Sequence, residues 1–78
     1  MKATVINTNK ELNEKNHPYR HDIIGKSKEE LLHRRLYVVA AIEDWKKNKY
    51  DATSDRVAYN INYFETELQI IDKELKTK

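Results

Sequence analysis

Few residues in this chain have side chains that could do chemistry, and the most suggestive of them precede residue 30. His17, His21 and Asp22 are near one another, and imidazole and carboxylate groups are common metal ligands. A stable metal site needs three or four converging ligands, however, and Pro18 interrupts any helix that would bring the two histidines onto one face. We therefore expect these histidines to be solvated, and we expect neither a metal nor another cofactor.

Two other patterns could indicate phosphate binding or catalysis. Gly25-Lys26-Ser27 is similar to the end of a phosphate-binding loop, but that loop needs a first glycine where this chain has Arg20, and no buried strand precedes it. The acidic pairs Glu29-Glu30 and Glu43-Asp44 are adjacent, and adjacent side chains on a helix diverge by about 100°. The sequence thus nominates no catalytic residue and predicts that the protein is not an enzyme.

Composition favours a small helical protein that completes its burial by assembling. The 78 residues make one domain at most, with 38% apolar and 36% charged residues and only one glycine and one proline to break helices. Without cysteine there can be no disulfide, which favours a cytoplasmic location, and no apolar run approaches the roughly 20 residues that cross a bilayer. The abundance of lysine, asparagine, isoleucine and tyrosine is typical of phage and mobile-element proteins from low-GC bacteria.

Two long helices must position whatever site exists. Ser27 and Glu30 form a capping-box pattern that predicts a helix over 28–47, and apolar residues at spacings of three and four predict a second helix over 55–76. The intervening turn, with Asn48 in a left-handed conformation, makes the helices antiparallel. The matching stripes predict Trp45 facing Val57, Ile42 facing Ile61, Val38 facing Phe64 and Leu31 facing Ile71. Arg35 falls on this seam, and we expect it to pair with Asp72 or Glu65.

Residues 1–26 form a polar N-terminal arm in this interpretation, and residues 27–78 form the helical hairpin. A short helix from Thr8 to Lys15 is predicted within the arm. The second helix carries another partly apolar stripe, which consists of Tyr59, Tyr63, Thr66 and Ile70. Either the arm covers this stripe with Tyr19, Ile23 and Ile24, or another molecule does. Two hairpins that join into a four-helix dimer would be the commonest arrangement of the second kind.

The predicted function is binding to a partner protein, as an inhibitor or adaptor that occupies a surface. Tyrosine is enriched at protein interfaces, and on that basis the predicted binding residues are Tyr37, Tyr59, Tyr63 and Ile70. The alternative is a nucleic-acid-binding accessory protein. Its net charge of +2 is too balanced to decide the matter, but basic residues concentrate near the start of the first long helix. The residues predicted to contact phosphate are Arg20, Lys26, Lys28 and Arg34.

Overall fold

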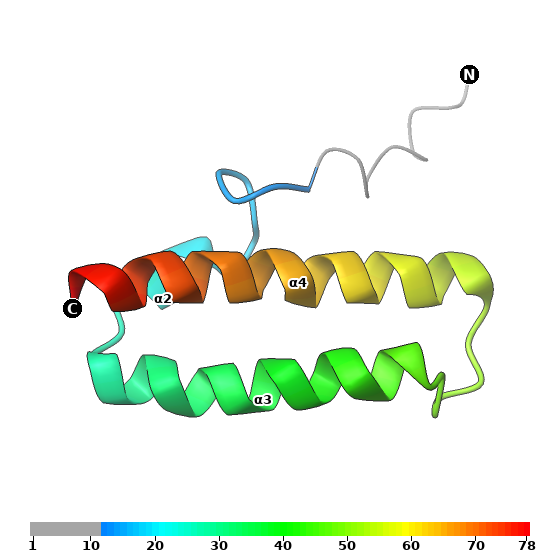
Figure 1. Cartoon of the computed structure of the whole chain (residues 1–78). Helices are drawn as coiled ribbons and strands as arrows, with labels where there is room; N and C mark the ends of the chain where they lie inside the picture. Colours follow the sequence, from blue (N-terminus) through cyan, green and yellow to red (C-terminus); the bar gives the residue numbers. More distant parts are fainter. Residues whose placement is uncertain (1–11) are drawn as a thin grey trace, which may run out of the picture.

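The computed structural model describes residues 12–78, and this part of the chain confirms the all-α class (Figure 1). Its three helices are α2 (Arg20–Ile24), α3 (Lys28–Lys46) and α4 (Ser54–Thr77). The two long helices lie side by side and run in opposite directions, and α2 packs against α4 near the C-terminal end of α4 (Figure 1). None of the helices within residues 12–78 is long and apolar enough to cross a membrane.

Helix α3 begins at the predicted capping box. The Ser27 hydroxyl accepts a hydrogen bond from the Glu30 N–H at 3.2 Å, and the Glu30 carboxylate accepts one from the Ser27 N–H at 2.9 Å. Two of the N–H groups that have no partner within the helix are satisfied in this way. The hydrogen bond from the Ser27 N–H also lowers the pKa of the Glu30 carboxyl group. The sequence signal for this helix start is confirmed.

The turn between α3 and α4 is held by one asparagine. Asn48 adopts the predicted left-handed conformation, with φ of 51°. Its side-chain amide donates to the Ala52 carbonyl at 3.1 Å and its side-chain oxygen accepts from the Ala52 N–H at 2.9 Å. Thr53 then caps α4 by accepting from the Arg56 N–H. Beside this turn the Trp45 ring packs on Tyr50, with 4.4 Å between ring centroids.

The hydrophobic core lies where all three helices meet. Its buried side chains share aliphatic character and come from each helix in turn: Ile23 of α2, Leu31, Val38 and Ile42 of α3, and Ile70 and Ile71 of α4. Tyr19, Phe64, Leu68 and Leu75 pack around this cluster. Ala41 of α3 is also buried.

The part of the chain that precedes α3, residues 12–27, is called the N-terminal segment and covers one side of α4. In Figure 1 residues 12–19 cross α4 on the side away from α3, and α2 follows. Thr66 and Ile70 are buried beneath this segment, so the chain itself covers much of the second apolar stripe. Ile23 is fully buried, whereas Ile24 is partly exposed. Lys78 at the end of α4 contacts the link between α2 and α3. Its ammonium group donates hydrogen bonds to the carbonyls of Ile24 and Lys26.

The short helices were the weakest part of the sequence prediction. The predicted helix over residues 8–15 begins outside the described residues, and residues 12–15, which are described, are not helical. The structure instead has the five-residue helix α2, which the sequence analysis did not predict and which has no side-chain cap. A helix this short is not stable alone, so its contacts with α4 must hold it in place.

Candidate functional site

The predicted binding residues of α4 lie under or beside the N-terminal segment. Ile70 is only 5% exposed and belongs to the core, so it presents no surface in this conformation. Tyr59 and Tyr63 are half-buried, and their rings lie 6.4 Å apart. Burial, reinforced by the negative charge of Glu67, raises the pKa of the Tyr63 phenol. Tyr37 of α3 is different, because more than half of its surface is exposed.

His17 holds the N-terminal segment against α4. We expected a solvated side chain, and that expectation is wrong, because His17 is only 3% exposed. Its Nδ1 atom accepts a hydrogen bond from the Tyr19 N–H at 3.0 Å, so Nε2 carries the proton and donates to the Tyr63 carbonyl at 2.9 Å. The imidazole also lies 4.4 Å from the Tyr63 ring, measured between centroids. A neutral histidine thus makes every polar contact available to it.

We expect His17→Ala to loosen the N-terminal segment and to lower the free energy of unfolding by about 2 kcal/mol, because two hydrogen bonds and a ring contact are lost. The helices α3 and α4 should remain, so circular dichroism should change little at low temperature. Limited trypsin digestion should cut faster after Lys15 and Arg20. His21→Ala, which changes an exposed histidine on the same segment, is the matched control. Equal digestion of the two variants would show that His17 does not hold the segment.

Arg34 is part of a buried ion pair, which the sequence analysis did not find. Its Nε atom donates to Glu67 at 2.6 Å and its Nη2 atom donates to the other carboxylate oxygen at 3.0 Å. The Glu67 side chain is fully buried and that of Arg34 is 25% exposed. The guanidinium group lies between the rings of Tyr19 and Tyr37, at 4.6 and 4.7 Å from their centroids. The hydrogen bonds with Glu67 raise the pKa of Arg34 above its ordinary value.

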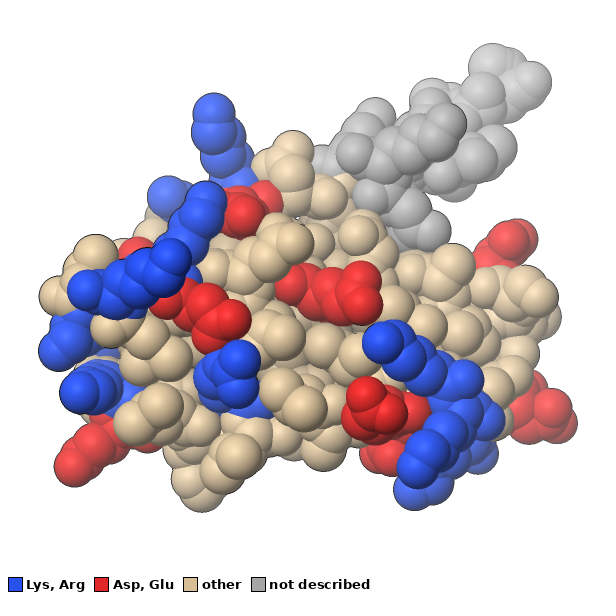
Figure 2. Space-filling model, in the orientation of Figure 1, with Lys and Arg blue, Asp and Glu red and all other residues tan. Residues whose placement is uncertain are grey.

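The four predicted phosphate contacts are distributed over more than one part of the surface. Arg34 pairs with Glu67 and shares a hollow with Lys26, whose ammonium group lies 5.6 Å from the Tyr19 ring. Arg20 lines a separate hollow next to Ile70 and Glu74, and Lys28 is exposed at the start of α3. Figure 2 shows lysine and arginine side chains gathered towards both ends of this face, with acidic side chains among them.

Arg35 pairs with Asp72, which confirms the predicted ion pair across the seam. The Arg35 Nε atom lies 2.7 Å from the Asp72 carboxylate, and this contact raises the pKa of the guanidinium group. Both side chains are more than 40% exposed, however, so the pair lies at the edge of the helix interface and not within it. The pair therefore differs from the buried Arg34–Glu67 contact one residue away.

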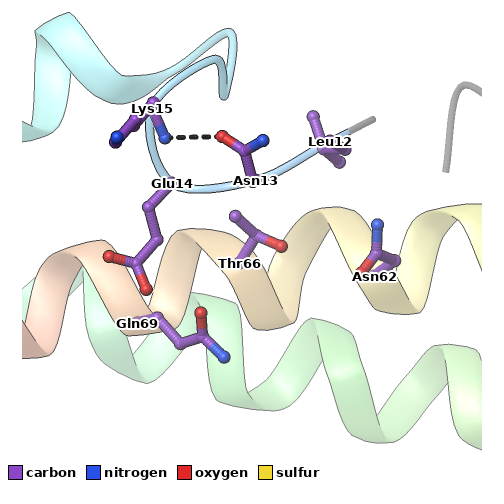
Figure 3. Close-up of a pocket in the computed structure, with 7 residues that line it drawn as sticks. All are labelled: Leu12, Asn13, Glu14, Lys15, Asn62, Thr66 and Gln69. Atoms are coloured by element: carbon purple, nitrogen blue, oxygen red, sulfur yellow. Dashed lines mark hydrogen bonds between the residues drawn. The ribbon is translucent and has the colours of Figure 1, made fainter. Parts of the chain in front are cut away.

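An open hollow of about 530 Å³ separates the N-terminal segment from α4 (Figure 3). Asn62, Thr66 and Gln69 of α4 form one wall, and residues 12–15 form the other. Across the segment the Lys15 N–H donates to the Asn13 side chain, and Glu14 pairs with Lys73 of α4. The lining is mostly amide and hydroxyl, and Glu14 and Lys15 are its charged members.

The least covered apolar surface lies on the outer side of α3. Leu32, Leu36 and Val39 are 47%, 72% and 38% exposed. Their spacing of four and three residues places them in one row along the helix, and we call this row the outer face of α3. Exposed leucines at helical spacing were visible in the sequence, but the choice of which apolar stripe is buried depends on tertiary contacts.

The described residues show neither a cluster of metal ligands nor a likeness to a known protein. Across residues 12–78, no group of three or more histidine, cysteine, aspartate or glutamate side chains could hold a metal ion. Comparison with family models, with curated proteins and with solved structures finds no match. Residues 12–78 form a small all-α fold with the surfaces described above.

Proposed function

We propose that this protein is a non-enzymatic binding module that covers part of a partner protein with the outer face of α3. The observation that carries the proposal is the exposure of Leu32, Leu36 and Val39 in one row. Contiguous exposed apolar side chains on a small protein commonly mark an interaction site. Scattered exposed leucines need no such explanation, but these three share one side of a single helix.

Tyr59 and Tyr63 of α4 would contribute less to this binding than the outer face of α3 does. The N-terminal segment already covers much of their stripe. Ile70 and Thr66 are buried, and the Tyr63 carbonyl accepts a hydrogen bond from His17. Tyr37 of α3 remains more than half exposed, with its ring edge-on to the Phe64 ring. The rigid pair of long helices supports the outer face from behind, which lowers the entropic cost of binding. An inhibitor or an adaptor, encoded by a phage or a mobile element, would act in this way.

The function is tested by binding measured with three full-length proteins. Leu36→Glu places a charge in the middle of the outer face, and Gln69→Glu adds the same charge to an exposed position on α4. A partner captured by the natural chain and then purified should bind Leu36→Glu at least about tenfold more weakly. It should bind Gln69→Glu unchanged, and both variants should keep their helix content.

Retention of nucleic acid in place of protein would overturn the proposal. In that case Lys28→Glu should weaken binding, raising the salt concentration should weaken it steeply, and Leu36→Glu should have little effect. The pair with Glu67 uses two of the five N–H donors of Arg34, so a phosphate contact by this residue would have to be made by the remaining donors.

A further inference from the structure

The outer face of α3 has charged residues at both ends of its apolar row. Continuing the same spacing, Glu29 precedes Leu32, and Glu43 and Lys46 follow Val39. All three charged residues are exposed, and none of them is in an ion pair that the structure records within residues 12–78. The row therefore reads acid, three apolar residues, acid and base along the full length of the helix.

This order is complementary to itself when the helix is reversed. If two copies of α3 lie antiparallel about a two-fold axis at the helix midpoint, Leu36 of each copy meets Val39 of the other. At each end Glu29 of one copy then meets Lys46 of the other. Glu43 meets Leu32, one helical turn from the exposed ammonium group of Lys28.

Other arrangements of the same two helices are poorer. Parallel helices in register would place Glu29 on Glu29, Glu43 on Glu43 and Lys46 on Lys46, which are like charges. Sliding the antiparallel pair by seven residues in either direction would also set charged against apolar residues, Glu29 against Val39 or Lys46 against Leu36, and would lose both Glu29–Lys46 contacts. The register with Glu29 opposite Lys46 differs in two ways. The two copies of α3 (Lys28–Lys46) overlap over their whole length, and opposite charges meet at both ends.

We propose that the partner of the outer face is a second copy of this chain, which packs α3 against α3 in this antiparallel register. The proposal rests on the proposed function, because it names the occupant of the same surface. The two copies would then meet through α3, with the N-terminal segments of both copies on the outside, against α4. The exposed apolar row would be covered without any change in the fold of the monomer.

Cysteine cross-linking tests the direction of the helices, and the chain has no cysteine of its own to interfere. Full-length E29C and K46C carrying tags of different size should be mixed and oxidised. The antiparallel register predicts that the mixed species predominates and that each variant alone cross-links poorly. Cross-linked species of one variant in amounts equal to the mixed species would overturn the proposal. A natural chain that remains monomeric in sedimentation equilibrium at about 1 mM would also overturn it.

Charge reversal tests the register itself. E29K alone and K46E alone each turn two attractive contacts into repulsive ones, so each should weaken dimerisation by about tenfold. The double variant E29K/K46E restores opposite charges at both ends and should dimerise within about threefold of the natural chain. A double variant no better than the single ones would exclude this register.

The failure of this inference differs from the failure of the proposed function. If the chain is monomeric but Leu36→Glu still abolishes binding to a different purified protein, the outer face is a binding site for that protein and the self-association is wrong. If Leu36→Glu changes neither self-association nor binding, both proposals are wrong.

Discussion

Arg34→Met should lower the free energy of unfolding by about 3 to 5 kcal/mol, because it leaves the fully buried carboxylate of Glu67 without a partner. A domain of this size rarely has more than about 3 to 5 kcal/mol of stability in total. The variant should therefore be largely unfolded at 25 °C. Urea denaturation followed by circular dichroism measures the effect.

The neighbouring ion pair provides the control for this prediction. Arg35→Met removes the same chemical group one residue away, but the Arg35–Asp72 pair is nearly half exposed and should contribute at most about 1 kcal/mol. The double variant Arg34→Met/Glu67→Met replaces both charges with apolar side chains and should recover most of the stability. Equal effects of Arg34→Met and Arg35→Met would contradict the assignment of Glu67 as a buried partner.

Ile23→Ala should cost about 2 to 5 kcal/mol, because Ile23 is fully buried in the core and its removal leaves a cavity. Ile24, its neighbour, is 37% exposed, and Ile24→Ala should cost less than about 1 kcal/mol. Thermal or urea unfolding of the two variants measures the difference. An effect of Ile23→Ala no larger than that of Ile24→Ala would mean that α2 is an accessory arm and not part of the folded core.

The two long helices could be predicted to within a residue or so at each end, and the reason is local. Ser27 and Glu30 make a cap that needs only four consecutive residues, and Thr53 and Asn48 act within five residues of their partners. Apolar spacing then fixes the type of each element. These signals survive without knowledge of the rest of the fold.

The contacts that decide which surfaces are covered join distant residues. His17 meets Tyr63 across 46 positions, and nothing local distinguishes it from the exposed His21. The five residues of α2 form a helix only on α4, so no propensity signal predicts them. Arg34 meets Glu67 across 33 positions, so this ion pair also joins residues that are far apart in the sequence.

The predicted register contained a signal for the Arg34–Glu67 pair that was not used. That register sets Arg35 opposite Leu68, and Arg34 and Glu67 are the direct sequence neighbours of these two residues. A charge that falls on a buried seam calls for an opposite charge across it, and this rule was applied only to Arg35. The exposed row of α3 was also not predictable from local sequence. Both sides of that helix are apolar, and only tertiary packing decides which side is buried.

The Trp45–Tyr50 contact determines what an optical experiment on this protein can see. Trp45 is the chain's single tryptophan, and it lies beside the turn between α3 and α4, at the opposite end of these helices from α2 (Figure 1). Its fluorescence therefore reports the local environment of that turn alone, whereas circular dichroism averages over all helices. If the two signals give the same midpoint in urea, the molecule melts as one cooperative unit; if the dichroism changes first, the end that holds α2 unravels separately.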